Sequence, residues 1–94
     1  MNVRRLLLDV DKALARPSVL EISEAIEKLP QVEGLNITVT SIDTETLGMD
    51  VTIEGTNLDY HSIAAAIEQT GAVVHSIDEI AAGQRLVERV PRSR

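Results

Sequence analysis

Hydrophobic and polar residues follow a strand-like period in most of the chain and a helical period in two stretches. Residues 3–10 are nearly all apolar and predict a central strand. In residues 34–40 and 49–54, apolar and polar side chains alternate with period two, and a turn at residues 44–48 separates the two stretches. They therefore predict a hairpin with one buried face. Residues 72–82 predict the last strand.

Two helices are predicted between these strands. The first begins after Ser18, because Ser18 and Glu21 have the spacing of a capping box, and Pro30 ends it. Its apolar stripe contains Leu20, Ile22, Ala25, Ile26 and Leu29. The second takes Asn57 as its N-cap and ends at Gly71, which suits a left-handed C-cap. Its apolar stripe contains Leu58, Ile63, Ala66 and Ile67.

The predicted order, strand-helix-strand-strand-helix-strand, favours one ferredoxin-like α+β domain over residues 1–94. In that fold, two helices pack on one face of a four-stranded antiparallel sheet. Right-handed crossovers place strands one and three at the centre, strand four beside strand one and strand two beside strand three. Residues 83–94 form a mixed, basic tail with four arginines. The tail suits contact with anionic ligands or crossing to a neighbouring subunit of this acidic protein, and crossing is favoured, while residues 92–94 are expected to fray.

Several polar side chains are expected to gather at one end of the sheet, where strands one and three end and strands two and four begin. These residues are Asp9, Asn36, Glu54 and Ser76, with Asp11, Asn57 and His75 nearby. The alternation points Asp9, Asn36 and Glu54 to the helix-free face.

The strongest chemical candidate is the carboxylate group of Asp9, Glu54 and Asp78. Carboxylates held close together repel one another unless a cation or proton intervenes, and Ca²⁺ prefers several oxygen ligands. The group therefore predicts a divalent-cation site, with Ca²⁺ as the favoured ion. The simpler interpretation is an ion pair of Arg5 with Asp78 or with Asp9, and the pair with Asp78 is favoured. No EF-hand spacing is present.

His75 is the more informative of the two histidines. It suits a metal ligand, a proton carrier or a pH sensor, but no second histidine stands at ligand spacing, so a polar strand or interface position is favoured. An enzyme using His75 with Asp78 or Glu79 is disfavoured, because His75 and Asp78 fall on opposite strand faces. We therefore expect no catalytic residues.

Composition narrows the class of protein further. The net charge of −6 and the single aromatic residue, Tyr60, argue against nucleic-acid binding. The absence of cysteine excludes disulfides and thiolate metal sites. No apolar run approaches a membrane span, and Leu6-Leu7-Leu8 is too short for a signal peptide, so we expect a cytoplasmic protein without membrane contact.

Four segments resemble one known family. They are Leu8-Asp9-Val10, residues 34–39, residues 52–59 and residues 75–83, of which the last two are specific. They are similar to the family called domain of unknown function 211, best known from archaea, and the similarity extends from Val3 to about Val90. The resemblance implies a ferredoxin-like fold and ring-shaped homo-oligomers. It implies no reaction.

These observations favour a non-enzymatic, ring-like homo-oligomer that binds or senses a ligand, with a divalent cation as the expected ligand. The alternative is a structural or adaptor ring that binds a protein partner without metal. In that alternative the tail contributes apolar surface through Leu86, Val87 and Val90.

Overall fold

A computed structural model describes residues 1–92 of the chain. Its elements follow in the order β1 (Val3–Ala13), α1 (Val19–Glu27), β2 (Val32–Ile42), β3 (Thr46–Gly55), α2 (Tyr60–Gln69) and β4 (Val73–Ala82). The predicted element order is confirmed, although β1, β2 and β3 are longer than predicted. The end of the predicted tail, residues 93 and 94 with Arg94, lies outside the described residues.

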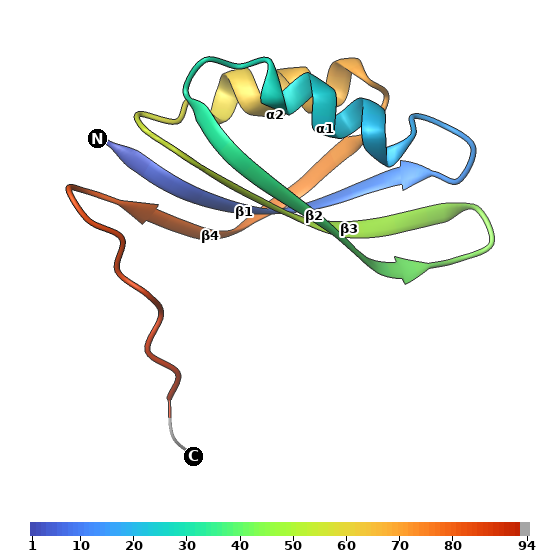
Figure 1. Cartoon of the computed structure of the whole chain (residues 1–94). Coiled ribbons are helices and arrows are strands. Elements are labelled where there is room, and N and C mark those ends of the chain that lie inside the picture. The colour runs from blue at the N-terminus through green and yellow to red at the C-terminus, as the bar shows by residue number, and fades with distance from the viewer. Residues whose placement is uncertain (93–94) are drawn as a thin grey trace.

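The four strands form one sheet with the order β2-β3-β1-β4, and every neighbouring pair is antiparallel. Both helices lie on the same side of this sheet (Figure 1). The ferredoxin-like α+β fold and the predicted strand order are therefore confirmed. The other side of the sheet, which we call the open face, carries no helix in the described part of the chain (Figure 1).

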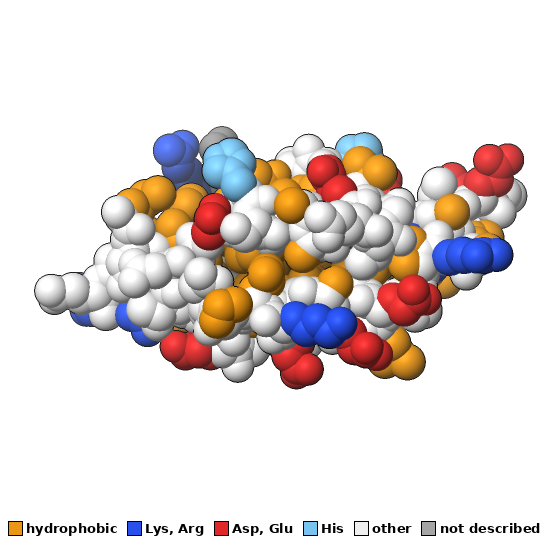
Figure 2. Space-filling view, turned by 90° about the horizontal axis from the view of Figure 1, so that it is seen from above, with side chains coloured by type: hydrophobic (Ala, Val, Ile, Leu, Met, Phe, Trp, Pro, Cys, Tyr) orange, Lys and Arg blue, Asp and Glu red, His pale blue; other side chains and the backbone are white. Residues whose placement is uncertain are grey.

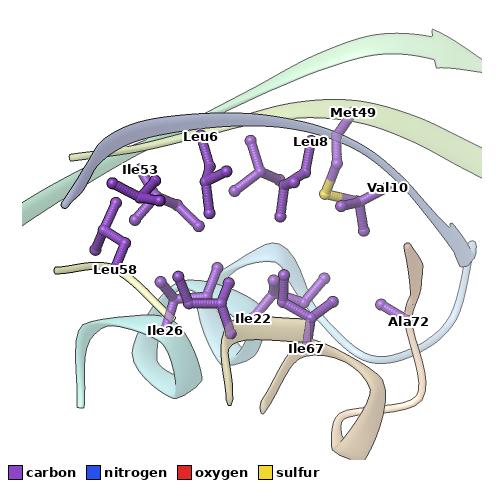
Figure 3. Packing of buried hydrophobic residues seen from close by; sticks show 13 residues of the cluster. Leu6, Leu8, Val10, Ile22, Ile26, Met49, Ile53, Leu58, Ile67 and Ala72 are labelled. Carbon is purple, nitrogen blue, oxygen red and sulfur yellow. The ribbon is translucent and has the colours of Figure 1, made fainter. Parts of the chain in front are cut away.

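The core lies between the sheet and the helices (Figure 3). Alternate residues of β1 and β3 point into it, as period-two patterning requires. The largest fully buried side chains are Leu6, Leu8, Val10, Ile22, Ile26, Met49, Val51, Ile53, Ile63 and Ile67. These side chains are aliphatic except for the thioether of Met49, and none of them is aromatic. Leu20, predicted in the apolar stripe of α1, is 73% exposed, so its place in that stripe was wrong.

The helix ends agree with the sequence at α1 and differ at α2. Ser18 and Glu21 form the predicted capping box. The N-cap of α2 is Asp59, whose side chain accepts from the backbone N–H of His61, so the prediction of Asn57 was wrong. Asn57 has a φ of 51°, a left-handed conformation that asparagine tolerates better than most residues. It turns the chain two residues before the cap.

Two glycines fix the connections around α2. Gly71 has a φ of 105° directly after the C-cap Thr70, as predicted. A Cβ on Gly55 would overlap the carbonyl oxygen of Gln31, so only glycine allows the end of β3 to pass this close to the start of β2. Neither helix among the described residues is long and apolar enough to cross a membrane.

Candidate functional site

The direction of β3 decides where the predicted site residues lie. β1 and β3 are antiparallel, with Arg5 opposite Glu54 and Asp9 opposite Asp50. The expectation that Asp9 and Glu54 meet at one end of the sheet was therefore wrong, because the carboxyl ends of antiparallel neighbours lie at opposite ends. Four residues of strand separate the two positions, roughly 13 Å.

The predicted residues instead fall into separate groups on the open face. Asp9, Asn36 and Glu54 all lie on this face, as predicted, because their neighbours in the strands point into the core. Ser76 is opposite Asp9 near the middle of the sheet. Asn36 and Glu54 lie together at the end of the sheet where β2 begins.

Arg5 is the centre of the ion pairs at that end. Its Nε donates to Oε2 of Glu54 over 2.8 Å, and its Nη1 donates to both carboxylate oxygens of Glu88 over 2.9 and 3.0 Å. Oε1 of Glu79 lies 3.6 Å from the same Nη1. The hydrogen bond that Arg5 donates to Glu54, followed by that to Glu88, raises the pKa of Arg5 above its usual value. Glu54 is thus already paired with a positively charged side chain of the protein, Arg5.

The favoured pairing of Arg5 with Asp78 was wrong. Oδ1 of Asp78 accepts a hydrogen bond from Oγ of Ser76 over 2.6 Å. The pairing of β1 with β4 shifts register between Leu7 and Leu8 and again between Asp9 and Val10. These irregularities leave Asp78 and His75 without paired residues on β1, so simple alternation does not assign the face of either side chain.

His75 lies beside Asp11, since its Nε2 is 2.7 Å from Oδ2 of Asp11. Both side chains are partly exposed. Asn57 stands apart from both, in the turn that follows β3, where its backbone N–H donates to Oδ1 of Asn2 over 2.7 Å. Asp11, Asn57 and His75, which were predicted to lie near one end of the sheet, therefore do not share one site.

No group of three or more histidine or carboxylate side chains among residues 1–92 is placed to hold a metal ion. Asp9 and Asp50 are cross-strand partners, so two carboxylate side chains lie opposite each other on the open face. Calcium binding by this protein stays a prediction. The three carboxylates predicted as its ligands, Asp9, Glu54 and Asp78, lie in three different local environments.

A shallow hollow on the open face was not predicted. It has a volume of about 320 Å³ and is lined by Glu33, Gly34, Leu35, Asn36, Thr52 and Glu54. Gly34 opens it, because a Cβ built there meets no atom within 4 Å. Glu33 stands on one rim, and its Oε2 accepts from Oγ1 of Thr56 over 2.9 Å. The two carboxylates make the hollow acidic, and only the register of β2 on β3 brings them together.

A second hollow, of about 380 Å³, lies between the helices and is lined by Ala25, Lys28, Leu29, Ala66, Gln69 and Thr70. Figure 2 looks onto this helix-covered side, where hydrophobic side chains gather in the middle and charged ones lie mainly toward the margins. Lys28 is the one charged residue in this lining, so the hollow offers fewer charged groups for binding a ligand than the hollow on the open face.

Both edges of the sheet expose aliphatic side chains. On β2, Val39 is 42% exposed and Ile42 is 72% exposed; on β4, Ile77 and Ile80 are 44% and 52% exposed. Val39, Ile77 and Ile80 pair with core residues of the neighbouring strands, so they lie on the helix-covered face just beyond the cover of the helices. We call these three residues the apolar margins of the sheet.

The chain matches one family over residues 4–94, namely domain of unknown function 211, described as Uncharacterized ArCR. It belongs to this family. The resemblance seen in the sequence is thereby confirmed. Membership in domain of unknown function 211 names no reaction, ligand or partner.

A curated relative in the archaeon Methanocaldococcus jannaschii, called Uncharacterized protein MJ0319, is 42% identical to the chain over 89 residues. The match covers 95% of this chain and 91% of that protein. The domain described above is therefore nearly the whole of the relative as well.

Proposed function

We propose that this protein is a non-enzymatic, homo-oligomeric binding protein whose copies join edge to edge into a closed ring. The observation that supports this most directly is the direction of the two edge strands. β2 runs parallel to β1 and β4 runs antiparallel to it, so β2 and β4 have opposite directions. A second copy set beside the first in the same orientation brings its β2 against β4 as an antiparallel pair.

The edge strands also need such a partner. β2 has 11 residues and β4 has 10, and long edges with free backbone groups invite pairing unless they are protected. Edge-to-edge joining at one level places Ile77 and Ile80 of one copy opposite Ile37 and Leu35 of the next, because these residues share rows across the sheet. Val39 then lies opposite Val74. The apolar margins of both copies are then removed from water, which stabilises the pair by about 25 cal/mol for each Å² buried.

The contact is head to tail, since one surface of a copy meets a different surface of the next. Such contacts form rings if the rotation between copies closes and filaments if it does not. The twist of the sheet supplies a rotation of one fixed hand at every contact. A closed ring leaves the open faces of all copies available as a repeated binding surface.

The proposed joint is tested by placing charges on one margin. Ile77→Lys with Ile80→Lys puts two ammonium groups at the joint, and Leu20→Lys on α1 is the matched control at a position that is 73% exposed. We expect light scattering after gel filtration to give a monomer for the double variant and the ring mass for Leu20→Lys. A double variant with the mass of the wild-type ring contradicts the edge-to-edge joint.

A divalent cation, with Ca²⁺ first, is the ligand proposed for the open face, and a protein partner is the alternative. The observation that favours a cation is the direct opposition of Asp9 and Asp50, since like charges in this position destabilise a sheet. The test compares melting with EDTA and with added Ca²⁺. Stabilisation of the wild type that is lost in Asp9→Asn supports the cation, and an unchanged melting temperature in the wild type favours a metal-free adaptor ring.

A further inference from the structure

The last described residues form an extended segment that leaves the domain. Residues 84–92, which we call the arm, follow β4 and run away from the sheet on the side opposite the helices (Figure 1). Val87 and Val90 on the arm are 65% and 85% exposed. The arm therefore buries little of its apolar surface against its own domain.

The base of the arm is nevertheless held in place. Nη1 of Arg4 donates to the carbonyl oxygen of Gln84 over 2.9 Å, and Arg5 holds the carboxylate of Glu88. Because Arg5 lies on the open face of β1, the arm is fixed over this face up to Glu88. Residues 89–92 continue beyond the last of these anchors, with arginines at both ends.

From these contacts we propose that residues 89–92 of one copy dock in the acidic hollow at Glu33 and Glu54 of the next copy. The proposal rests on the edge-to-edge ring proposed above. Its ligand is the basic segment Arg89-Val90-Pro91-Arg92 of a second copy of this chain, and its receptor is the hollow opened by Gly34.

The topology brings the two parts together. β4 ends and β2 begins at the same end of the sheet, since Ala82 pairs with Val3, and Gly34 pairs with Glu54, which is opposite Arg5. When β4 of one copy pairs with β2 of the next, the base of the arm and the hollow therefore become neighbours. Both also lie on the open face.

The length of the arm fits this span. From β1, where Arg5 holds Glu88, the β2 strand of the next copy is two strand spacings away, roughly 10 Å. Residues 89–92 in extended form cover roughly 13 Å. The segment thus reaches the hollow between β2 and β3 of the next copy while Glu88 stays bound to Arg5.

Charge and space are complementary as well. The arm beyond Glu88 carries Arg89 and Arg92, whereas the hollow carries Glu33 and Glu54. Glu54 gives one oxygen to Arg5, so its other oxygen is available to a guanidinium group, and a carboxylate accepts several hydrogen bonds. Nothing lies within 4 Å of a Cβ at Gly34, which leaves room for the backbone of the arm.

Cross-linking tests this contact directly, because the chain has no cysteine of its own. Val90→Cys is made in one chain and Asn36→Cys in another, which leaves the arginines and glutamates intact. After the two chains are mixed and reassembled, mild oxidation should give a covalent dimer on a denaturing gel, and neither chain alone should give one. A ring that forms from the mixed chains without this covalent dimer overturns the proposal and leaves the ring itself intact.

Filling the hollow supplies the second test. Gly34→Leu introduces a side chain into space that is open in the domain, and we expect it to suppress the cross-link at least tenfold while the melting temperature of the ring changes little. Leu20→Ala, far from the hollow on α1, is the control and should leave the yield unchanged. An undiminished yield in Gly34→Leu shows that the arm docks elsewhere. A wild-type protein that is monomeric in solution refutes the ring, and the docked arm with it.

Discussion

Nη1 of Arg5 lies 2.9 Å from Oε1 of Glu88, although 83 positions separate them in the sequence. This contact ties the segment after the last strand to the first strand. Through its Nε, Arg5 also holds Glu54 of β3. One guanidinium group therefore links the centre of the sheet, the acidic hollow and the arm.

Replacing Arg5 should cost more stability than replacing a single carboxylate that it binds. Arg5→Gln removes the partner of Glu54, Glu79 and Glu88 together, whereas Glu88→Gln removes one exposed partner. We expect the urea midpoint to fall more in Arg5→Gln than in Glu88→Gln, and the difference to shrink in high salt, which screens exposed pairs. Equal midpoints for the two variants contradict the central role of Arg5.

The core prediction concerns two residues of α1 that the sequence pattern treats alike. Ile22 is fully buried and Leu20 is 73% exposed. Ile22→Ala should reduce the free energy of unfolding by about 2–5 kcal/mol, and Leu20→Ala should change it by no more than about 0.5 kcal/mol. Denaturant titration of both variants measures the contrast. A large loss in Leu20→Ala would mean that this side chain is covered in solution.

The N-cap of α2 predicts a dependence of stability on pH. A hydrogen bond from the Ser62 hydroxyl is the main cause that lowers the pKa of Asp59 below its ordinary value of 3.8. A lowered native pKa stabilises the fold above the unfolded pKa, and this contribution is lost as the pH falls through the native pKa.

Asp59→Asn isolates this contribution, because asparagine is also a good N-cap but carries no charge. We expect the wild type to melt above Asp59→Asn at neutral pH, and the two melting curves to converge as the pH is lowered below about 4. A difference in melting temperature that is the same at all pH values would show that the charge of Asp59 does not cause the difference in stability.

The cross-strand pair Asp9 and Asp50 predicts a stabilising substitution. Like charges directly opposite each other in a sheet are unfavourable, so Asp50→Asn should raise the free energy of unfolding by about 0.2–1 kcal/mol in the presence of EDTA. Thr52→Asn on the same strand, opposite Leu7, is the control for the chemistry of the substitution. A loss of stability in Asp50→Asn shows instead that Asp50 already has a favourable partner.

The fold was predictable from the sequence because its signals are local and repeated. Alternating apolar and polar residues specify the strands at residues 34–40 and 49–54, and the capping box at Ser18 specifies a helix. The order of these elements then restricts the topology. The N-cap of α2 was missed because Asn57 and Asp59 are both good caps. Only the left-handed φ of Asn57 separates them, and composition does not encode it.

The site was less predictable, because it depends on strand direction and register. Asp9 and Glu54 were grouped by the ends of their strands, but β1 and β3 run in opposite directions. On β4, two shifts in register interrupt the alternation of side chains, so the sequence does not show which face His75 and Asp78 occupy. The contacts of Arg5 with Glu79 and Glu88 depend on the irregular strand β4 and on the path of the arm, and sequence periodicity carries no signal for either.

The edge-to-edge ring is the central claim, and the mass of the native protein tests it most directly. Native mass spectra of the purified wild-type chain should show one closed oligomer with a single number of subunits over a wide range of concentration. A monomer, or a ladder of masses that grows with concentration as in an open filament, would contradict the ring.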